Sequence, residues 1–213
     1  MIRVPLIASE GLIPTLIPAA FSIVLLVAGI KGLSLLLAAS SVGIALFFRD
    51  PVRTVNVGDS DIVSPADGRV VAIDRKEEKK HLGGSSLRVS VFMSIFNVHI
   101  NRIPADGRVV EVNHISGGFK MAHLEEAGLE NERTEIVLED EKGRRSLMVQ
   151  VAGLVARRII CRLAPGDHVK AGQRFGLICF GSRVDVYLPP EAEPTVSVGD
   201  RVKAGISVIG ALS

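Results

Sequence analysis

The residues best suited to chemistry lie late in the chain, in the block Cys179–Arg183 (CFGSR). Ser182 offers a hydroxyl nucleophile, and Gly181 before it lacks a Cβ, which permits close approach and unusual backbone angles. Apolar runs on both sides, Phe175–Cys179 and Val184–Leu188, predict two strands that meet at this point. Taken alone, the Gly-Ser pair also fits an ordinary turn between strands, so the surrounding sequence must decide its role.

Composition excludes several other kinds of site. The two cysteines, Cys161 and Cys179, have neither metal-ligand spacing nor a disulfide-rich pattern, so no metal is expected. The 213 residues carry 25 Lys and Arg against 23 Asp and Glu, and aromatic residues make up only 4%. That balance argues against nucleic-acid binding, which relies on a basic surface or on base stacking.

The first fifty residues are far more apolar than the rest. Between positions 12 and 48 the only charged residue is Lys31, which indicates contact with a bilayer. One helix over this run would be about 55 Å long against a hydrocarbon core of about 30 Å, so we expect a hairpin that reverses at Lys31-Gly32. Its arms, residues 12–30 and 33–48, either cross the bilayer or dip into it. A buried soluble hairpin and a cleaved signal peptide are the less favoured alternatives.

Basic residues flank this hairpin, since Arg3 precedes it and Arg49 and Arg53 follow it. The positive-inside tendency then places both ends at the cytoplasmic face of the cell membrane. We therefore expect a membrane-associated hairpin over residues 1–49 and a second domain over residues 50–213.

The second domain is expected to be mainly β. Short apolar runs alternate with Gly, Asp and Pro, and two motifs are repeated: PADGRVV starts at Pro65 and Pro104, and GDxVKAG starts at Gly166 and Gly199. Each repeat supplies a turn beside a strand. Duplicated hairpin units in a compact barrel or sandwich explain this pattern.

The GDxVKAG hairpins also occur in lipoyl- and biotin-carrier folds, so a carrier, or a membrane-anchored binding module without catalysis, is an alternative. A carrier must display a lysine at a hairpin tip, and Lys120 is the nearest candidate. It lies instead in the one short helix that we expect, Phe119–Ala127, which Gly128 ends.

Five blocks together make the chain resemble the phosphatidylserine decarboxylase family in its short prokaryotic form. They are FFRDP from Phe47, SPADG from Ser64, FNVHINRIP from Phe96, NER from Asn131 and FGS from Phe180. Their number and order make the resemblance specific, and it spans nearly the whole chain. It implies a pyruvoyl-dependent lyase that converts phosphatidylserine to phosphatidylethanolamine in phospholipid biosynthesis.

The resemblance also implies self-cleavage between Gly181 and Ser182, which leaves residues 1–181 and 182–213 as the two subunits of a heterodimer. Ser182 Oγ attacks the Gly181 carbonyl to give an ester, and elimination followed by hydrolysis leaves an N-terminal pyruvoyl group. This covalent pyruvate is the implied cofactor. Its ketone forms a Schiff base with the substrate amine and accepts the electrons that carbon dioxide leaves behind.

By matching motifs, the family assigns the activation of Ser182 to Asp67 and to the block that contains His99. A histidine oriented by a carboxylate is a common general base. The long bacterial and mitochondrial forms have a second histidine where this chain has Arg102, and an arginine stays protonated. The base is therefore expected to be His99 or another group, such as His114.

Substrate-binding residues are expected by chemistry and by motif. Arg49, Arg53 and Arg102 are candidates for the phosphodiester, because a guanidinium suits phosphate. Asn131 and Arg133 belong to the NER block and are candidates for lining the site, although a polar turn would look the same.

Some related residues have a simpler structural interpretation. Asp106, the repeat partner of Asp67, shows that Asp-Gly can serve as a turn alone. His81 follows the charged run Lys76–Lys80 and is expected in a solvated loop, and His123 and His168 are likewise interpreted as structural or surface residues.

A pyruvoyl decarboxylase of a soluble amino acid is a further alternative. Such an enzyme would not need the apolar hairpin. A lipid substrate does, because its acyl chains stay in the bilayer, where each buried CH₂ is worth about 0.8 kcal/mol. A homo-oligomer is left open.

Overall fold

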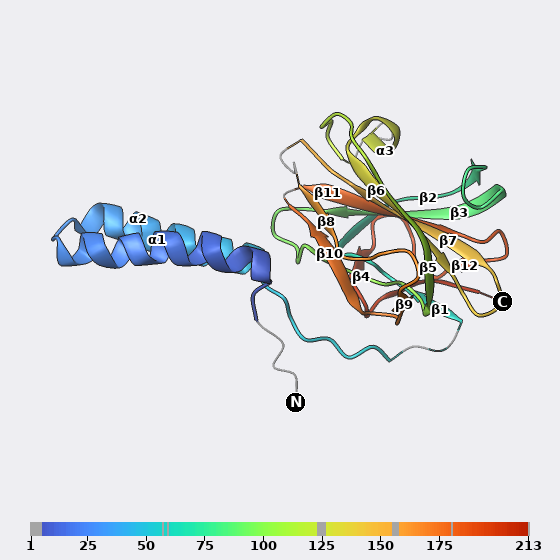
Figure 1. The fold of residues 1–213 in the computed structure, drawn as a ribbon, viewed down its shortest axis with the longest axis horizontal. Coiled ribbons are helices and arrows are strands. Elements are labelled where there is room, and N and C mark those ends of the chain that lie inside the picture. The colour runs from blue at the N-terminus through green and yellow to red at the C-terminus, as the bar shows by residue number, and fades with distance from the viewer. Residues whose placement is uncertain are drawn as a thin grey trace. The chain divides into compact units, whose positions relative to one another are not determined.

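The computed structural model describes residues 6–56, 58, 60–122, 127–154, 158–179 and 181–212. Arg3, His123 and Phe180 lie outside the described residues. The chain divides into two compact units, Met1–Val52 and Arg53–Ser213. Figure 1 shows the helices of the first unit in blue and the strands of the second in the remaining colours.

The first unit is a hairpin of α1 (Ser9–Val27) and α2 (Lys31–Phe47). The chain reverses at Gly29, whose φ of +82° lies in the left-handed region that glycine adopts without strain. The predicted reversal at Lys31-Gly32 is wrong, because Gly29 ends the first helix and Lys31 already begins the second.

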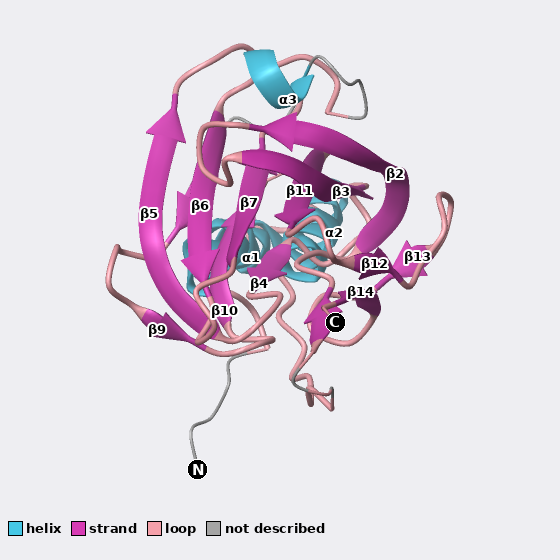
Figure 2. Cartoon of the chain, turned by 90° about the vertical axis from the view of Figure 1, so that its right-hand side faces the viewer, coloured by secondary structure: helices cyan, strands magenta, loops and turns pink. Residues whose placement is uncertain are grey.

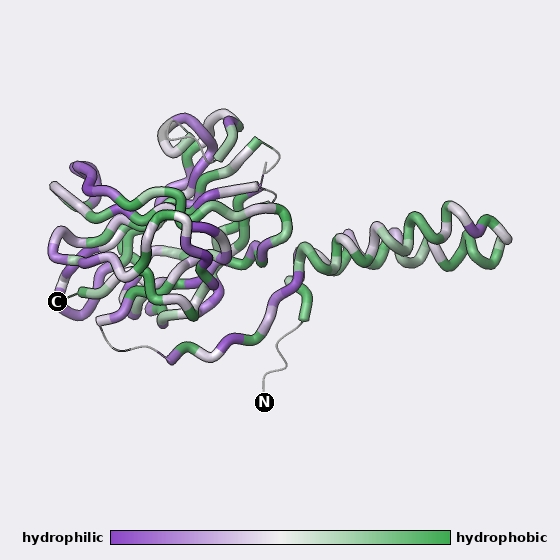
Figure 3. Tube along the Cα trace, turned by 180° about the vertical axis from the view of Figure 1, so that it is seen from behind, coloured by the Kyte–Doolittle hydropathy of each residue, from purple (hydrophilic) through white to green (hydrophobic). Residues whose placement is uncertain are grey.

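Small polar residues hold the two helices together. Ser22 Oγ donates to the Ser34 carbonyl and Ser34 Oγ to the Ser22 carbonyl, both at 2.8 Å, and Ser41 Oγ donates to the Thr15 carbonyl at 2.8 Å. The large apolar side chains face outwards instead, and Figure 3 shows both helices mostly in the hydrophobic colour. By length and composition α1 could cross a membrane, whereas α2 is shorter, so the hairpin is compatible with membrane association.

The second unit is mainly β, which confirms the predicted fold class. The strands of its largest sheet are β2 (Gly68–Glu78), β3 (Gly84–Met93), β5 (Gly107–Ile115), β6 (Arg133–Glu139), β7 (Arg145–Val151), β9 (His168–Val169), β11 (Ser182–Leu188) and β13 (Arg201–Val202). Their order is β13-β2-β3-β11-β7-β6-β5-β9. Figure 2 shows how strongly this sheet curls, which gives a half-barrel.

Two three-stranded sheets complete the unit. One has the order β4-β10-β8 and the other β1-β14-β12. Their strands are β4 (Ile100–Arg102), β8 (Ile159–Cys161), β10 (Arg174–Ile178), β1 (Asp61–Val63), β12 (Glu193–Pro194) and β14 (Val208–Ala211). Alternate residues of the curled sheet fill the core, as in Val184, Val186 and Leu188 of β11, which are fully buried.

The repeated motifs pair with one another. The first PADG copy leads into β2, which pairs with β13 of a GDxVKAG copy through Arg69 and Arg201. The second copy leads into β5, which pairs with β9 in the same way through Arg108 and His168. These equivalent pairings support the interpretation that the unit contains duplicated hairpins.

Among the described residues of the second unit, one short helix is present, α3 (Ala127–Glu130). The predicted position, Phe119–Ala127, is wrong for its first four residues, which are not helical, while residues 123–126 lie outside the described part. Gly118 pairs with Asn131 in an isolated bridge, so the backbone enters this loop extended. Gly128 lies inside the helix rather than after it.

Candidate active site

The bond between Gly181 and Ser182 lies where the chain enters the middle of the curled sheet. Ser182 begins β11, is fully buried and pairs with Met93, the last residue of β3. The next residue, Arg183, pairs with Val151, the last residue of β7. The first residues of β11 therefore lie between β3 and β7, two strands that precede the Gly181–Ser182 bond in the chain.

The Ser182 hydroxyl is buried and contacts a thioether sulfur. Ser182 Oγ donates to Met93 Sδ at 3.6 Å, and Asn101 Nδ2 donates to the same sulfur at 3.7 Å. Asn101 Oδ1 in turn accepts from Gln150 Nε2 at 2.8 Å. A thioether is a weak acceptor, so this contact leaves the hydroxyl largely available for reaction.

Gln150 adds an unsatisfied acceptor to this group. Within the described residues its Oε1 is buried and has no hydrogen-bond partner. A buried acceptor left unpaired costs free energy, about 1–3 kcal/mol. The site can therefore gain from a donor that a bound molecule or water supplies.

The Gly181 carbonyl is held against a second glycine. Gly181 has a φ of +63°, in the left-handed region. A Cβ on Gly153 would lie only 1.8 Å from the Gly181 carbonyl oxygen, so no side chain fits at position 153. Sequence reasoning missed Gly153, whose only signal is a glycine that follows an apolar run.

His99 lies beside the strand that leads to this bond. His99 is 2% exposed and directly precedes β4, and its carbonyl accepts the N–H of Ile178 at 3.4 Å. Ile178 is three residues before Gly181. Because side chains alternate along an extended chain, we expect the His99 side chain on the same side as that of Asn101, which contacts Met93.

Asp67 is engaged at a turn. Arg53 donates to both of its carboxylate oxygens, at 2.5 and 2.8 Å, and the Ala204 N–H donates to Oδ1 at 2.8 Å. In the second repeat Asp106 accepts the equivalent N–H, that of Ala171, at 2.8 Å. Both aspartates thus close a turn, and the buried pair with Arg53 is what distinguishes Asp67. Its predicted part in activating Ser182 stays a prediction.

The arginines that we predicted to bind phosphate have partners within the chain. Arg53 holds Asp67, and the buried Arg102 donates from Nη1 to the Gly172 carbonyl at 2.9 Å. Arg49, in the helical unit, donates to the Leu46 carbonyl at 2.6 Å. Phosphate binding by these residues stays a prediction.

The two candidates of the NER block lie in different places. Asn131 Nδ2 donates to the carbonyls of Lys120 and Ala152, at 2.8 and 2.7 Å, and thereby fixes the chain just before Gly153. Arg133 lies opposite Val151, which lies opposite Arg183, so these residues share one face of the sheet. Ser182 faces the other side, because neighbours along a strand alternate.

Two charged residues beside the bond were not predicted. Arg183 Nη1 donates to the Ala122 carbonyl at 2.9 Å, and its Nε lies 2.8 Å from Asp185 Oδ1, with both side chains almost completely buried. This pair ties the loop before α3 to the start of β11. In the same loop Lys120, the lysine that a carrier would display, pairs with Glu130 at 2.6 Å.

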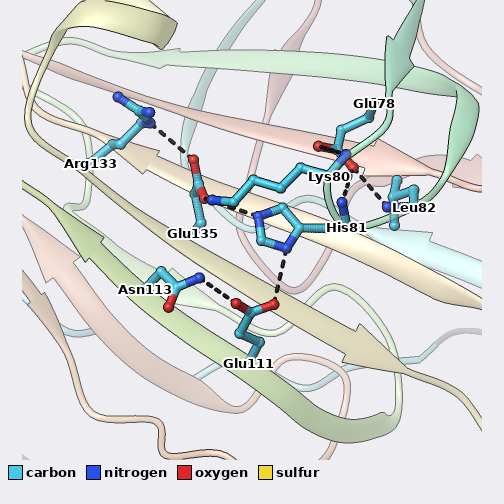
Figure 4. Close-up of polar contacts among 8 residues, drawn as sticks. All are labelled: Glu78, Lys80, His81, Leu82, Glu111, Asn113, Arg133 and Glu135. Carbon is cyan, nitrogen blue, oxygen red and sulfur yellow. Dashed lines mark hydrogen bonds and ion pairs between the residues drawn. The ribbon is translucent and has the colours of Figure 1, made fainter.

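A second cluster of titratable groups surrounds His81 (Figure 4). Its Nδ1 lies 3.1 Å from Glu111 Oε2 and its Nε2 lies 3.0 Å from Glu135 Oε2, which also accepts from Lys80 Nζ at 2.6 Å. The His81 side chain is only 3% exposed. The prediction of a solvated loop is wrong, because the turn between β2 and β3 is bound to β5 and β6.

The charges of this cluster stabilise one another. Burial alone would raise the pKa of Glu135, but hydrogen bonds from Lys80, His81 and Arg133 outweigh it and hold the pKa below its usual value of 4.5. Glu135 is two residues after Arg133 on β6, so it also faces away from Ser182. The cluster is therefore separate from the candidate site.

Known proteins match this chain over most of its length. A sequence profile described as phosphatidylserine decarboxylase matches residues 43–210. The phosphatidylserine decarboxylase proenzyme of Pelobacter propionicus is 48% identical over 181 residues, which cover 85% of this chain and 82% of that protein. The proenzyme of Nitrosomonas eutropha is 43% identical over 207 residues, 96% of this chain and 94% of that protein. That of Ralstonia pickettii is 49% identical over 166 residues, 78% and 77% of the two chains.

Proposed function

The chain belongs to the phosphatidylserine decarboxylase family, and from this premise we propose that it cuts its own Gly181–Ser182 bond and decarboxylates phosphatidylserine with the pyruvoyl group so formed. The product is phosphatidylethanolamine, a step of phospholipid biosynthesis. One observation carries the proposal: a buried serine hydroxyl follows a left-handed glycine whose carbonyl is held against Gly153.

The first step needs the Ser182 hydroxyl and the Gly181 carbonyl carbon. Ser182 Oγ attacks that carbon, the new C–O bond forms, and the C–N bond breaks, so that the Ser182 nitrogen leaves as an amine and takes up a proton. Gly181 lacks a Cβ, and its left-handed backbone is one that other residues adopt only with strain. Packing of the Gly181 carbonyl against Gly153 restricts the motion of the carbonyl carbon relative to Ser182 Oγ.

The second step separates the two fragments. The Ser182 Cα loses its proton to a base, the Cβ–Oγ bond breaks, and Gly181 departs as a carboxylate that ends the first fragment. Water then replaces the nitrogen of the remaining dehydroalanine, releasing ammonia and leaving pyruvate bound at the new N-terminus. A serine is required, because its oxygen is both the nucleophile and the group eliminated.

The bound pyruvate supplies a carbonyl pair that accepts electrons when carbon dioxide leaves the substrate. The chain's own residues hold and orient the reactants. Asn101 and Gln150 form a neutral, fully buried pair near the reactive end, and Gln150 Oε1 can accept a hydrogen bond from the substrate's amine. A neutral pair avoids the cost of a second buried charge.

We assign the proton transfers of cleavage to His99. It is buried beside the chain that leads to Gly181, and an imidazole can both accept and donate a proton, as a general base does. Asp67 would act through the turn that it closes with Arg53 and Ala204.

The fold supports a stable pair of fragments after cleavage. Residues 182–213 supply β11, which lies between β3 and β7, as well as β13 and β14, which pair with β2 and β1. Strands in the middle of a sheet cannot leave without breaking two ladders of hydrogen bonds. The two fragments should therefore remain one molecule, with the α1–α2 hairpin attaching it to the cytoplasmic face of the membrane.

The direct test is Ser182→Ala in the full-length chain, reconstituted in vesicles that contain phosphatidylserine. The variant should run as a single chain on a denaturing gel and form no phosphatidylethanolamine, while the unaltered protein runs as two fragments and forms the product. Ser146→Ala, which removes a serine outside the site, is the control. This variant should cleave itself and form phosphatidylethanolamine at the normal rate. Cleavage of the Ser182→Ala variant would refute the proposal.

A further inference from the structure

Three separate loops of the β unit carry exposed apolar side chains. Ile95 and Phe96 follow β3 and are 51% and 80% exposed, Met121 precedes α3 and is 50% exposed, and Leu154 follows β7 and is 54% exposed. We refer to these four residues as the apolar rim. Exposed apolar side chains that gather in one place mark contacts with a membrane or a partner.

The rim residues are close along the chain to groups at the reactive bond. Met93, whose sulfur accepts a hydrogen bond from the Ser182 hydroxyl, is two residues before Ile95. Leu154 adjoins Gly153, whose Cβ position is 1.8 Å from the Gly181 carbonyl oxygen and 3.3 Å from Ala122 Cβ. Met121 adjoins Ala122. Ala122 also accepts a hydrogen bond from Arg183, the residue after Ser182. Consecutive Cα atoms are about 3.8 Å apart, so each rim residue is one to three residues from a group that contacts Ser182 or its neighbours Gly181, Gly153 and Arg183.

The surface at this place is also where the buried site reaches solvent. Ser182 is fully buried, whereas Gly181, one residue before it, is partly exposed. The Cys179 N–H donates to the Arg158 carbonyl at 3.2 Å, and Arg158 is exposed. An exposed basic residue therefore lies beside the chain two residues before Gly181, as suits a surface that meets anionic lipid.

From this arrangement we propose that the apolar rim inserts into the lipid bilayer and brings the reactive end to the headgroup of a membrane lipid. The inference rests on the proposed function, because a substrate whose acyl chains stay in the bilayer must be met at the membrane surface. The hairpin alone would only tether the β unit. The rim fixes which face of that unit meets the lipid.

The chain contains no Trp, so a single introduced Trp reports on one place without background. Phe96→Trp places a tryptophan in the rim and keeps an aromatic side chain at position 96. Lys142→Trp is the matched control, since Lys142 lies in the exposed turn before β7, about 20 Å along that strand from the rim. Both variants are reconstituted full length in vesicles of phosphatidylcholine and phosphatidylglycerol, with or without brominated phosphatidylcholine.

We expect the Phe96→Trp emission to shift to shorter wavelength and to be quenched by brominated lipid, while Lys142→Trp stays exposed to water and unquenched. Equal exposure of the two to water would overturn the proposal. A shift without quenching by bromine would overturn it too, because the rim would then be covered by protein, either the hairpin or a second copy. The fluorescence of these variants does not depend on self-cleavage. Failure of membrane insertion can therefore be distinguished from failure of the proposed function.

Activity gives an independent readout. Phe96→Ser should lower the rate on vesicle phosphatidylserine at low lipid concentration by about tenfold or more, the loss expected when a phenylalanine no longer buries its side chain. The rate on a short-chain, monomeric phosphatidylserine should be unchanged, since no bilayer needs to be entered. An equal loss on both substrates would contradict a role in membrane insertion.

Discussion

At the scale of single residues, the proposed cleavage site contains two glycines as well as its serine. Gly181 supplies the left-handed backbone, and Gly153 leaves the space that the Gly181 carbonyl oxygen occupies. An alanine at position 153 must displace that oxygen, because its Cβ would lie only 1.8 Å away. The position of the carbonyl is thus set by a residue nearly thirty positions earlier in the chain.

We expect Gly153→Ala to slow self-cleavage at least about 100-fold, the effect typical of a displacement of about 1 Å in a reacting group. The measurement is the fraction of chain cut over time after synthesis, followed on a denaturing gel. Gly107→Ala is the control, since its Cβ would meet the Glu139 carbonyl oxygen at 2.7 Å, away from the site. It should lower the melting temperature yet cleave normally. Equal cleavage by both variants would show that Gly153 has only a structural role.

The histidines provide a second test at this scale. His99 is buried beside the approach to Gly181, whereas His114 lies on β5, which β6 and β7 separate from β11, and contacts Thr134 Oγ1 at 3.1 Å. We therefore expect His99→Ala to slow cleavage by about 10² to 10⁴-fold, as loss of a general base does, and His114→Ala to leave it unchanged. The dependence of the cleavage rate on pH should also change only in the His99 variant. The reverse pattern would move the base to His114.

At the scale of elements, the sequence was informative where a signal is local. The apolar hairpin, the strands on either side of Gly181-Ser182 and the paired repeats all follow from composition, periodicity and turn residues. Met93, Asn101, Gln150 and Gly153 could not be found in this way, because strand pairing brings them to Ser182 from distant positions. The turn of the hairpin was misplaced for a related reason: either Gly29 or Gly32 could reverse the chain, and only the backbone shows which one does.

His81 illustrates the same limit. A histidine after a run of lysines and glutamates looks solvated in sequence, yet folding of the β2–β3 turn onto the sheet buries it between Glu111 and Glu135 (Figure 4). These contacts join elements that are thirty or more positions apart. They fasten the tip of the longest hairpin to the strands that support β7 and, through it, β11.

Stability should therefore depend on pH through Glu135. Its pKa is lowered in the folded protein, so the unfolded chain binds a proton more readily, and the stabilisation is complete above the usual carboxyl pKa of 4.5 and is lost as pH falls through the folded value. Glu135→Gln should lower the melting temperature at neutral pH, with the difference from the parent shrinking below pH 4.5. The melting temperatures of the parent and the variant are both measured in the uncut Ser182→Ala background. Glu141→Gln, in an exposed turn, should have little effect on the melting temperature. A difference that stays constant with pH would contradict this account.

At the scale of the whole molecule, the chain combines an apolar helical hairpin with a β unit in which β11 begins at the bond that we propose is cut. Because β11 is held on both sides, cleavage can release a new N-terminus without dismantling the sheet. Ser182 is buried because it is the first residue of a core strand. The proposed self-processing is compatible with a stable fold, because the proposed break falls at the end of a strand and not within it.

Intact-mass spectrometry of the purified, active protein tests the central claim most directly. We predict two masses, one for residues 1–181 and one for a fragment of residues 182–213 that is lighter by one ammonia than the same peptide with an N-terminal serine. The Ser182→Ala variant should give a single mass for the whole chain. An active preparation in which the unaltered chain stays in one piece, with its serine unchanged, would contradict the account.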